Sequence, residues 1–219
     1  MALYTNRIDD GKWDYFKDLF FFYQSFNVYI KRINSFLEED VASEKDIYEN
    51  YLKALKEEDD LFEEFNYESD WKATEGLVDI YYDSFIMSMY SFTEKKMYIL
   101  SNFLSQSQNV KLGDIAGKGI FKYKKYLEKV CDIDFKPIEK DWDSLQQFNV
   151  LRNHLVHAEG NRSLLNGNQQ LIDFLKTIHG VILTEENNFV NFHFASDSIL
   201  YDFLNCSQRV IEYLYKKKG

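Results

Sequence analysis

The chain has 219 residues, of which 45% are hydrophobic and 17% aromatic, so it carries too much apolar material to remain disordered. It has 26 Lys and Arg residues against 36 Asp and Glu residues. The resulting formal charge of −10 excludes a broadly basic nucleic-acid-binding surface, so any nucleic acid must meet a local patch. With only 9 glycines and 1 proline, the chain has little turn material, which favours long helices.

The two cysteines, Cys131 and Cys206, lie far apart without Cys-x-x-Cys spacing, so neither a disulfide framework nor a zinc site is indicated. No apolar run approaches the roughly 20 residues that a bilayer-spanning helix needs, and the N-terminus lacks a basic flank followed by an apolar segment. We therefore expect a cytoplasmic protein of one domain, residues 1–219, with no membrane partner, metal or cofactor.

Apolar residues recur at three- and four-residue steps from position 13 to about position 38, which predicts a wide-faced, mostly buried helix. A second helical pattern begins after Ser43, whose hydroxyl is suited to cap a helix, and continues to Phe65. The acidic run 57–60 within it is expected to be a solvated helix face, because consecutive carboxylates on a helix point in different directions.

Residues 72–104 are expected to form one very long helix or two stacked ones, with Gly76 as a candidate bend. Glu94 lies at the edge of the apolar band of this segment, where its carboxylate faces either solvent or a cleft. Three of the nine glycines lie between positions 106 and 119, which predicts a loop with a short helix starting near Asp114.

The segment after this loop is the most basic stretch outside the C-terminal tail. Its lysines, interleaved with Phe121, Tyr123 and Tyr126, are Lys118, Lys122, Lys124, Lys125 and Lys129. In an acidic chain this is where contacts to phosphate are expected, so Lys118, Lys122, Lys124 and Lys125 are candidate substrate-binding residues. The plainer alternative is an amphipathic helix with a lysine-rich, solvated face.

Pro137 ends this basic unit, and a further helix is expected from about Ile138 to His157, with Gly160 as its terminating residue. A polar loop rich in Asn and Gly follows. Segments 180–183 and 189–194 flank a turn-like Glu-Glu-Asn-Asn sequence, which predicts a small β-hairpin. A final helix, capped by Ser196 or Asp197, is expected to run to the lysine-rich tail.

The helix that ends at His157 has two unlike faces. Phe148, Leu151 and Leu155 fall together and form its core face. The nearly opposite face carries Gln146, Asn149, Asn153 and His157, mixed with Trp142, Val150 and Val156. Because amides and an imidazole stand beside large apolar side chains there, we expect this face to meet another part of the chain or a second copy.

Arg152 and His157 supply the chemistry available on this helix. A histidine in the last turn lies at the negative end of the helix dipole and can exchange protons near neutral pH, and the planar guanidinium suits phosphate oxygens. Five positions amount to about 140° of rotation, so only the length of arginine, fraying of the helix end or a second subunit would bring both onto one phosphate. The plainer alternatives are an ion pair between Arg152 and an acid such as Glu94, and a purely structural His157. His154 is expected to be structural.

In this context the run FNVLRNHLVHAEG, residues 148–160, resembles the signature of the HEPN superfamily (higher eukaryotes and prokaryotes nucleotide-binding). That signature is an Arg, then a polar residue, then a His at the end of an inner helix, and Asn153 occupies the polar position. The surroundings are similar too: a preceding helix with YSFTEKKMYIL, the basic segment GKGIFKYKKYLEK and a trailing hairpin and helix. The resemblance covers roughly residues 72–217, and residues 1–71 are expected to be a helical N-terminal extension.

The resemblance implies an all-α, HEPN-like helical bundle with additional N-terminal helices and a small C-terminal β-hairpin. It implies a homodimer in which the two Arg-His motifs meet, and a metal-independent endoribonuclease of the toxin or antiphage kind, with RNA as substrate and a cognate antitoxin or inhibitor as partner. Arg152, His157 and Asn153 are then the catalytic candidates, and Glu94 and Asn149 support them. The alternative is a non-catalytic module of the same type that binds a nucleotide, RNA or a partner protein, which the acidic charge favours.

Overall fold

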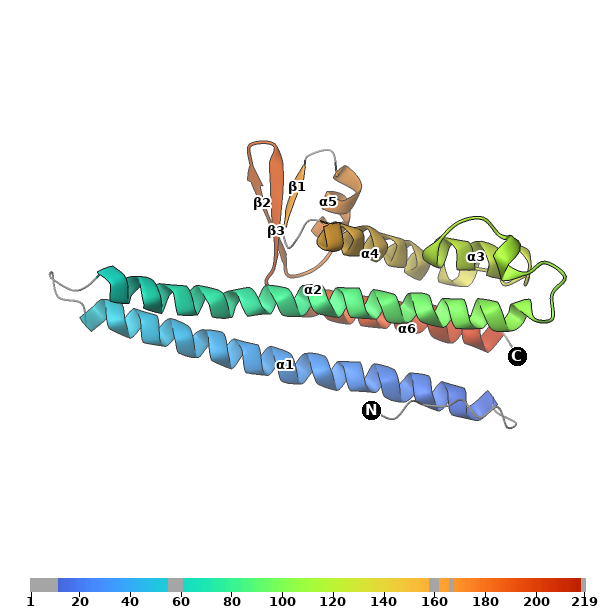
Figure 1. Cartoon of the computed structure of the whole chain (residues 1–219), viewed down its shortest axis with the longest axis horizontal. Helices are drawn as coiled ribbons and strands as arrows, with labels where there is room; N and C mark the ends of the chain where they lie inside the picture. The colour runs from blue at the N-terminus through green and yellow to red at the C-terminus, as the bar shows by residue number, and fades with distance from the viewer. Residues whose placement is uncertain (1–11, 55–60, 158–161, 166–167, 218–219) are drawn as a thin grey trace. The chain divides into compact units, whose positions relative to one another are not determined.

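The computed structural model describes residues 12–54, 61–157, 162–165 and 168–217. These residues are mostly helical, with a small three-stranded antiparallel sheet near the C-terminus (Figure 1). None of the helices in these ranges combines the length and the apolar character that a membrane crossing requires. The mostly helical class and the predicted C-terminal hairpin are thus confirmed.

Two of the described helices are long, at 43 and 45 residues, as the scarcity of Gly and Pro predicts. In chain order the described helices are α1 (Lys12–Ala54), α2 (Leu61–Ser105), α3 (Gly119–Lys129), α4 (Glu139–His157), α5 (Gln169–Lys176) and α6 (Ser198–Lys217). Single 3-10 turns lie at Leu112–Asp114 and Lys136–Ile138, just before α3 and α4. The loop after α2 and the helix ending at His157 therefore lie where the sequence predicts them. The short helix expected to start near Asp114 is instead a 3-10 turn that ends there, and the basic segment forms the helix α3.

Helix α1 continues without a break through Ser43, so the prediction of a second helix starting there is wrong (Figure 1). A hydroxyl suited to capping does not end a helix when no glycine or proline is nearby, and the neighbouring residues are tolerated in a helix interior. The acidic run 57–60 and the terminating Gly160 lie outside the described residues.

Helix α2 is one continuous helix rather than two stacked ones, and it passes through Gly76. It begins at Leu61, so position 72, where the resemblance was expected to begin, lies inside it. Its face turned to the protein interior carries Phe85, Ile86 and Met89, all nearly fully buried. The middle of the apolar band predicted from helical spacing is therefore packed, whereas its end members Leu77 and Phe103 are exposed.

The sheet contains β1 (Ser163–Leu165), β2 (Val181–Glu186) and β3 (Phe189–Phe194) in the order β1-β3-β2, with both pairs antiparallel. Strands β2 and β3 form the predicted hairpin, and Asn187 in its turn has φ 54°, a conformation that Asn tolerates. The prediction of a plain polar loop before this hairpin is wrong, because β1 and α5 lie there. Three residues of strand and eight of helix are too short for sequence periodicity to reveal.

The described residues divide into two compact units, and four helices contribute to both. The first unit holds the described residues up to Val28, Ser91–Leu145 and those from Leu204 onward; the second holds Tyr29–Ala54, the part of α2 up to Tyr90, and the described residues from Gln146 to Phe203. Helix α4 therefore divides between Leu145 and Gln146.

Three hydrogen-bonded hydroxyl groups lie in the core of the first unit. The side chains of Tyr23 and Thr93 hydrogen-bond to the Ser207 hydroxyl at 3.0 and 2.6 Å, and all three residues are almost completely buried. Burial raises the pKa of Tyr23 well above its usual range, so this phenol stays neutral. Pairing the three hydroxyls satisfies polar groups that would otherwise be costly to bury.

Candidate functional site

Helix α4 buries the face that the sequence assigns to the core. Phe148, Leu151 and Leu155 are each 5% exposed or less. The Phe148 ring stacks on Phe203 of α6 with centroids 4.1 Å apart and meets Phe174 of α5 edge-on. These aromatic contacts fix the rotation of α4, so Asn149 and Asn153 lie on its other, half-buried face.

The Trp142 side chain, which the sequence places on the same face as the amides, is more deeply buried than they are. It is 2% exposed, and it packs edge-on against Phe121 and Phe135 in the first unit. The sequence predicts that this face meets another part of the chain or a second copy, and at Trp142 it meets two aromatic residues of the chain itself. A tryptophan near the start of a helix can reach neighbouring aromatic residues that helical spacing alone does not reveal.

Arg152 is half-buried and held by neighbours on two sides. Its Nη1 donates a hydrogen bond of 2.9 Å to the side-chain oxygen of Asn153, and its guanidinium carbon lies 5.6 Å from the centre of the Tyr90 ring. Asn153 in turn donates to the side-chain oxygen of Asn149 at 3.4 Å. The structure thus joins three of the predicted site residues in one polar chain along α4.

The guanidinium of Arg152 retains unused donors in this arrangement. Its Nε is buried without a hydrogen-bond partner, and the bond to Asn153 is the one hydrogen bond its side chain makes within the described residues. A guanidinium carries five N–H groups, and leaving a buried one unsatisfied costs about 1–3 kcal/mol. An anion that reached this group would gain charge-assisted hydrogen bonds.

His157 is the last residue of α4, and its side chain is exposed. Within the described residues it makes no hydrogen bond or ion pair, and it takes no part in the Arg152–Asn153–Asn149 chain. The structure therefore does not bring Arg152 and His157 together within one chain. His154, between them, lies against Phe192 of β3 with ring centroids 5.9 Å apart, as expected for a packing histidine.

The predicted lysines and Glu94 belong to the first unit, whereas Arg152 and His157 belong to the second. Glu94 is half-buried near Tyr123, and burial of the phenol together with this carboxylate raises the pKa of Tyr123. Lys118 and Lys125 are exposed and Lys122 is half-buried. Lys124 differs, because its Nζ lies 5.0 Å from the Trp142 ring centre and 5.2 Å from that of Phe135.

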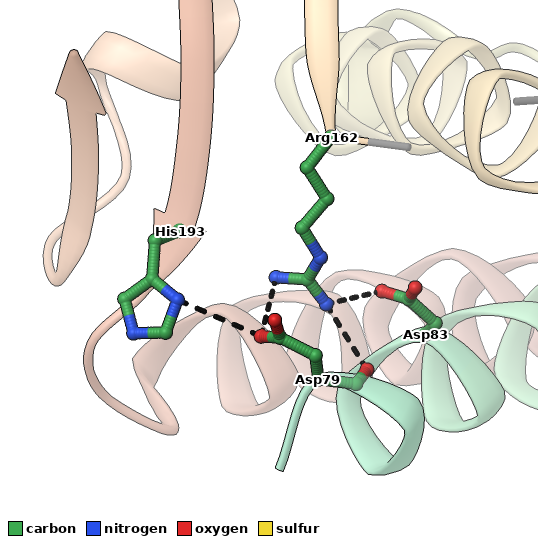
Figure 2. A network of polar contacts seen from close by, with 4 residues as sticks. All are labelled: Asp79, Asp83, Arg162 and His193. Atoms are coloured by element: carbon green, nitrogen blue, oxygen red, sulfur yellow. Dashed lines mark hydrogen bonds and ion pairs between the residues drawn. The ribbon is translucent and has the colours of Figure 1, made fainter. Parts of the chain in front are cut away.

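A second polar cluster, centred on Arg162, was not anticipated from the sequence. Figure 2 shows its guanidinium between two carboxylates of α2: Nη1 lies 3.0 Å from Asp79 Oδ1, and Nη2 lies 2.5 Å from Asp83 Oδ1. Nη2 also donates to the backbone carbonyl of Asp79 at 3.0 Å. On the other side of Asp79, the Nδ1 atom of His193 lies 3.6 Å from the same carboxylate.

This cluster attaches the sheet to α2. Arg162 precedes β1, its side chain is only 9% exposed, and its guanidinium carbon lies 4.4 Å from the centre of the Phe194 ring of β3. Burial raises the pKa of Asp83, although the Arg162 charge opposes the shift. Because both carboxylates and the ring are already occupied by the guanidinium, the cluster is a structural device. Asp79 and Asp83 lie four residues apart on one helix face, but nothing in the sequence identifies Arg162 as their partner.

The described residues contain no group of three or more His, Cys, Asp or Glu side chains placed to hold a metal ion. No family model, no curated protein and no solved structure matches this chain significantly.

Proposed function

We propose that this protein is a metal-independent endoribonuclease of HEPN type in which Arg152 and His157 act on one RNA phosphodiester. The observation that carries the proposal is the state of the motif on α4: the Arg152 guanidinium is oriented by Asn153 and Tyr90 with donors to spare, and the His157 imidazole is exposed at the end of the same helix.

The reaction requires two proton transfers. It also requires stabilisation of the negative charge that develops on the phosphoryl oxygens. An imidazole takes the proton of the ribose 2′-hydroxyl while the 2′-oxygen attacks phosphorus, and an imidazolium protonates the departing 5′-oxygen. Arg152 binds the phosphoryl oxygens on which negative charge builds up. The products are an RNA fragment with a 2′,3′-cyclic phosphate and a fragment with a 5′-hydroxyl.

A second copy of the chain completes this site in the proposal. Arg152 and His157 do not contact each other within one chain, and a two-fold dimer would supply a second pair of motifs to the same phosphodiester. The dimer also provides two histidines, one for each proton transfer. The toxin or antiphage role and a cognate inhibitor remain proposals that follow from the motif alone.

A non-catalytic module that binds a nucleotide, RNA or a partner protein is the alternative. The observation that favours it is that Arg152 already contacts Asn153 and Tyr90, in a chain with a formal charge of −10. Such a module needs the anion-binding arginine but no proton transfer.

Cleavage of pooled RNA in excess chelator tests the proposal, comparing wild type with Arg152→Gln and His157→Gln. Loss of His157 removes acid–base catalysis and is expected to lower the rate about a hundredfold or more, and loss of Arg152 by a similar factor. Wild-type activity should depend on pH as a bell-shaped curve around neutrality.

Two matched variants control for charge and fold. Arg32→Gln and His179→Gln each change an exposed residue of the same kind away from α4, and both should keep wild-type activity. Equal cleavage by all five proteins would remove Arg152 and His157 from the chemistry. RNA binding without any turnover would leave only the module.

A further inference from the structure

One face of α3 carries a stripe of lysines. Ile120 and Leu127 of α3 are fully buried and define the packing face. At about 100° per residue, four lysines cluster within roughly 60° of arc on the opposite side. They are Lys118 at the N-cap, Lys122, Lys125 and Lys129. At about 1.5 Å per residue this lysine stripe is about 16 Å long, and three of its members are exposed while Lys122 is half-buried.

The lysine stripe differs from the set that the sequence suggested. Lys124 points to the packing side, where its Nζ lies over the rings of Trp142 and Phe135, and Lys129 takes its place. Gly117 and Gly119, on either side of Lys118, have φ of 123° and 59°, a conformation in which side chains other than Asn and Asp are strained.

The lysines of the stripe outnumber the acidic residues of α3, of which Glu128 is the only one. Within the described part of the chain none of its four ammonium groups forms an ion pair, whereas Lys45, Lys72 and Lys216 each pair with a glutamate on their own helix. The first turn of α3 contains no acidic residue, so the positive end of the helix dipole adds to the same field. In a chain of net charge −10, this is a local site for a polyanion.

An aromatic ring stands at the border of the lysine stripe. Phe121 is 47% exposed, although its ring packs edge-on against the buried Trp142 with centroids 6.2 Å apart. Trp142 is itself held by Phe135 and Lys124, so Phe121 rests on a fixed support. An exposed ring beside a row of cations is the combination that binds unpaired nucleotides, because a base can stack on the ring while phosphates follow the lysines.

We propose that the lysine stripe and Phe121 form a binding surface for single-stranded nucleic acid, with successive phosphates on the lysines and one base stacked on Phe121. A duplex is excluded because its bases are already stacked on each other and offer no free face to the ring. This surface does not depend on the ribonuclease activity proposed above, since it uses other residues and needs no proton transfer.

Binding of fluorescein-labelled oligo(dT) of about 12 nucleotides tests the proposal on the full chain. This probe lacks the 2′-hydroxyl, so binding is measured even if the protein cleaves RNA. Each phosphate contact to a single strand contributes about 0.7 to the slope of log K against log salt. The Lys122/Lys125/Lys129→Gln variant should therefore lose about 2 from this slope and about a hundredfold in affinity near 0.1 M salt. Phe121→Leu should weaken binding about tenfold and leave the slope unchanged.

The matched control is Lys31/Lys53/Lys176→Gln, which removes the same charge from three exposed lysines elsewhere and should bind like wild type. Circular dichroism of each variant verifies that it is folded. Equal losses in the two triple variants, equal affinity for a duplex of the same length, or no binding of oligo(dT) by wild type would overturn the proposal. None of these results bears on cleavage in chelator, which depends on Arg152 and His157.

Discussion

Arg162 and Arg152 both lie in the second unit, but their side chains have different kinds of partners. Arg162 forms ion pairs with two carboxylates, donates hydrogen bonds to Asp83 and to the backbone carbonyl of Asp79, and packs on Phe194. Arg152 has one hydrogen bond to a neutral amide and a tyrosine ring, and within the described residues it forms no ion pair. The Nε atom of each arginine is buried without a hydrogen-bond partner. An arginine with partners like those of Arg152 can bind an added phosphate without giving up an ion pair.

Arg162→Met is expected to destabilise the protein by about 3 kcal/mol, because it leaves Asp83, whose side chain is 14% exposed, without its cation. Arg209→Met is the matched control: Arg209 pairs with Asp141, but its side chain is 58% exposed, so its loss should cost less than about 1 kcal/mol. Urea unfolding of both variants measures the difference. Equal losses would show that the Arg162 cluster does not hold the sheet on α2.

The pH dependence of Asp83 follows from its burial. Its pKa lies above the ordinary 3.8 in the folded protein, so its contribution to stability is fully present below that pH and is lost as the pH rises through the folded-state value. Arg162 lowers this pKa, so Arg162→Met should raise it further. Titration of the Asp83 carboxyl by carbon NMR measures both values, and a lower value in the variant would contradict the assignment.

At the scale of elements, Gly76 tests how α2 is stabilised. A Cβ added at this position would meet nothing within 4 Å, and the residue lies well inside a continuous helix. Gly76→Ala should therefore stabilise the protein by about 0.5–1 kcal/mol, since alanine loses less backbone entropy on folding. Gly117→Ala, at φ 123°, should destabilise it. Thermal unfolding compares the two, and a destabilised Gly76→Ala would mean that the helix needs a bend there.

Most elements of this chain could be predicted because their signals are local. Helical spacing locates the packing face of α4 and the middle of the packing face of α2. Alternation with an Asn-Asn turn locates the hairpin of β2 and β3. The predicted break at Ser43 is wrong because a residue that can cap a helix can also lie within one. The missed β1 and α5 are too short to show a period.

The candidate site was predictable only in part, for a related reason. Arg152, Asn153 and Asn149 lie on one helix, so their hydrogen bonds follow from spacing. The Arg162 cluster joins residues 79 positions apart in the sequence, and the contact of Lys124 with Trp142 joins two helices. Such pairs depend on tertiary packing, which a single sequence does not specify. The catalytic roles of Arg152 and His157 stay predictions.

The proposed catalytic site requires two copies of the chain. Sedimentation equilibrium should give twice the chain mass of 26.2 kDa at micromolar concentration. A strict monomer would leave Arg152 and His157 apart and would contradict the proposed site.

Mixing inactive variants tests whether the two chains share a site. If Arg152 of one protomer and His157 of the other serve the same phosphodiester, a heterodimer of Arg152→Gln and His157→Gln contains one intact pair. This heterodimer keeps one of the two histidines that serve the proton transfers, so subunit exchange should recover cleavage above that of either homodimer but well below wild type. Recovery is absent if each chain supplies both groups to its own site, so mixtures as inactive as the separate variants would contradict the shared site.

The most direct measurement is the chemistry of the RNA ends that the wild-type protein produces in excess chelator. The proposed mechanism produces 2′,3′-cyclic phosphate and 5′-hydroxyl ends, which we expect from wild type and not from His157→Gln. RNA that stays intact, ends with a 3′-hydroxyl, or cyclic phosphate ends formed equally well without His157 would contradict it.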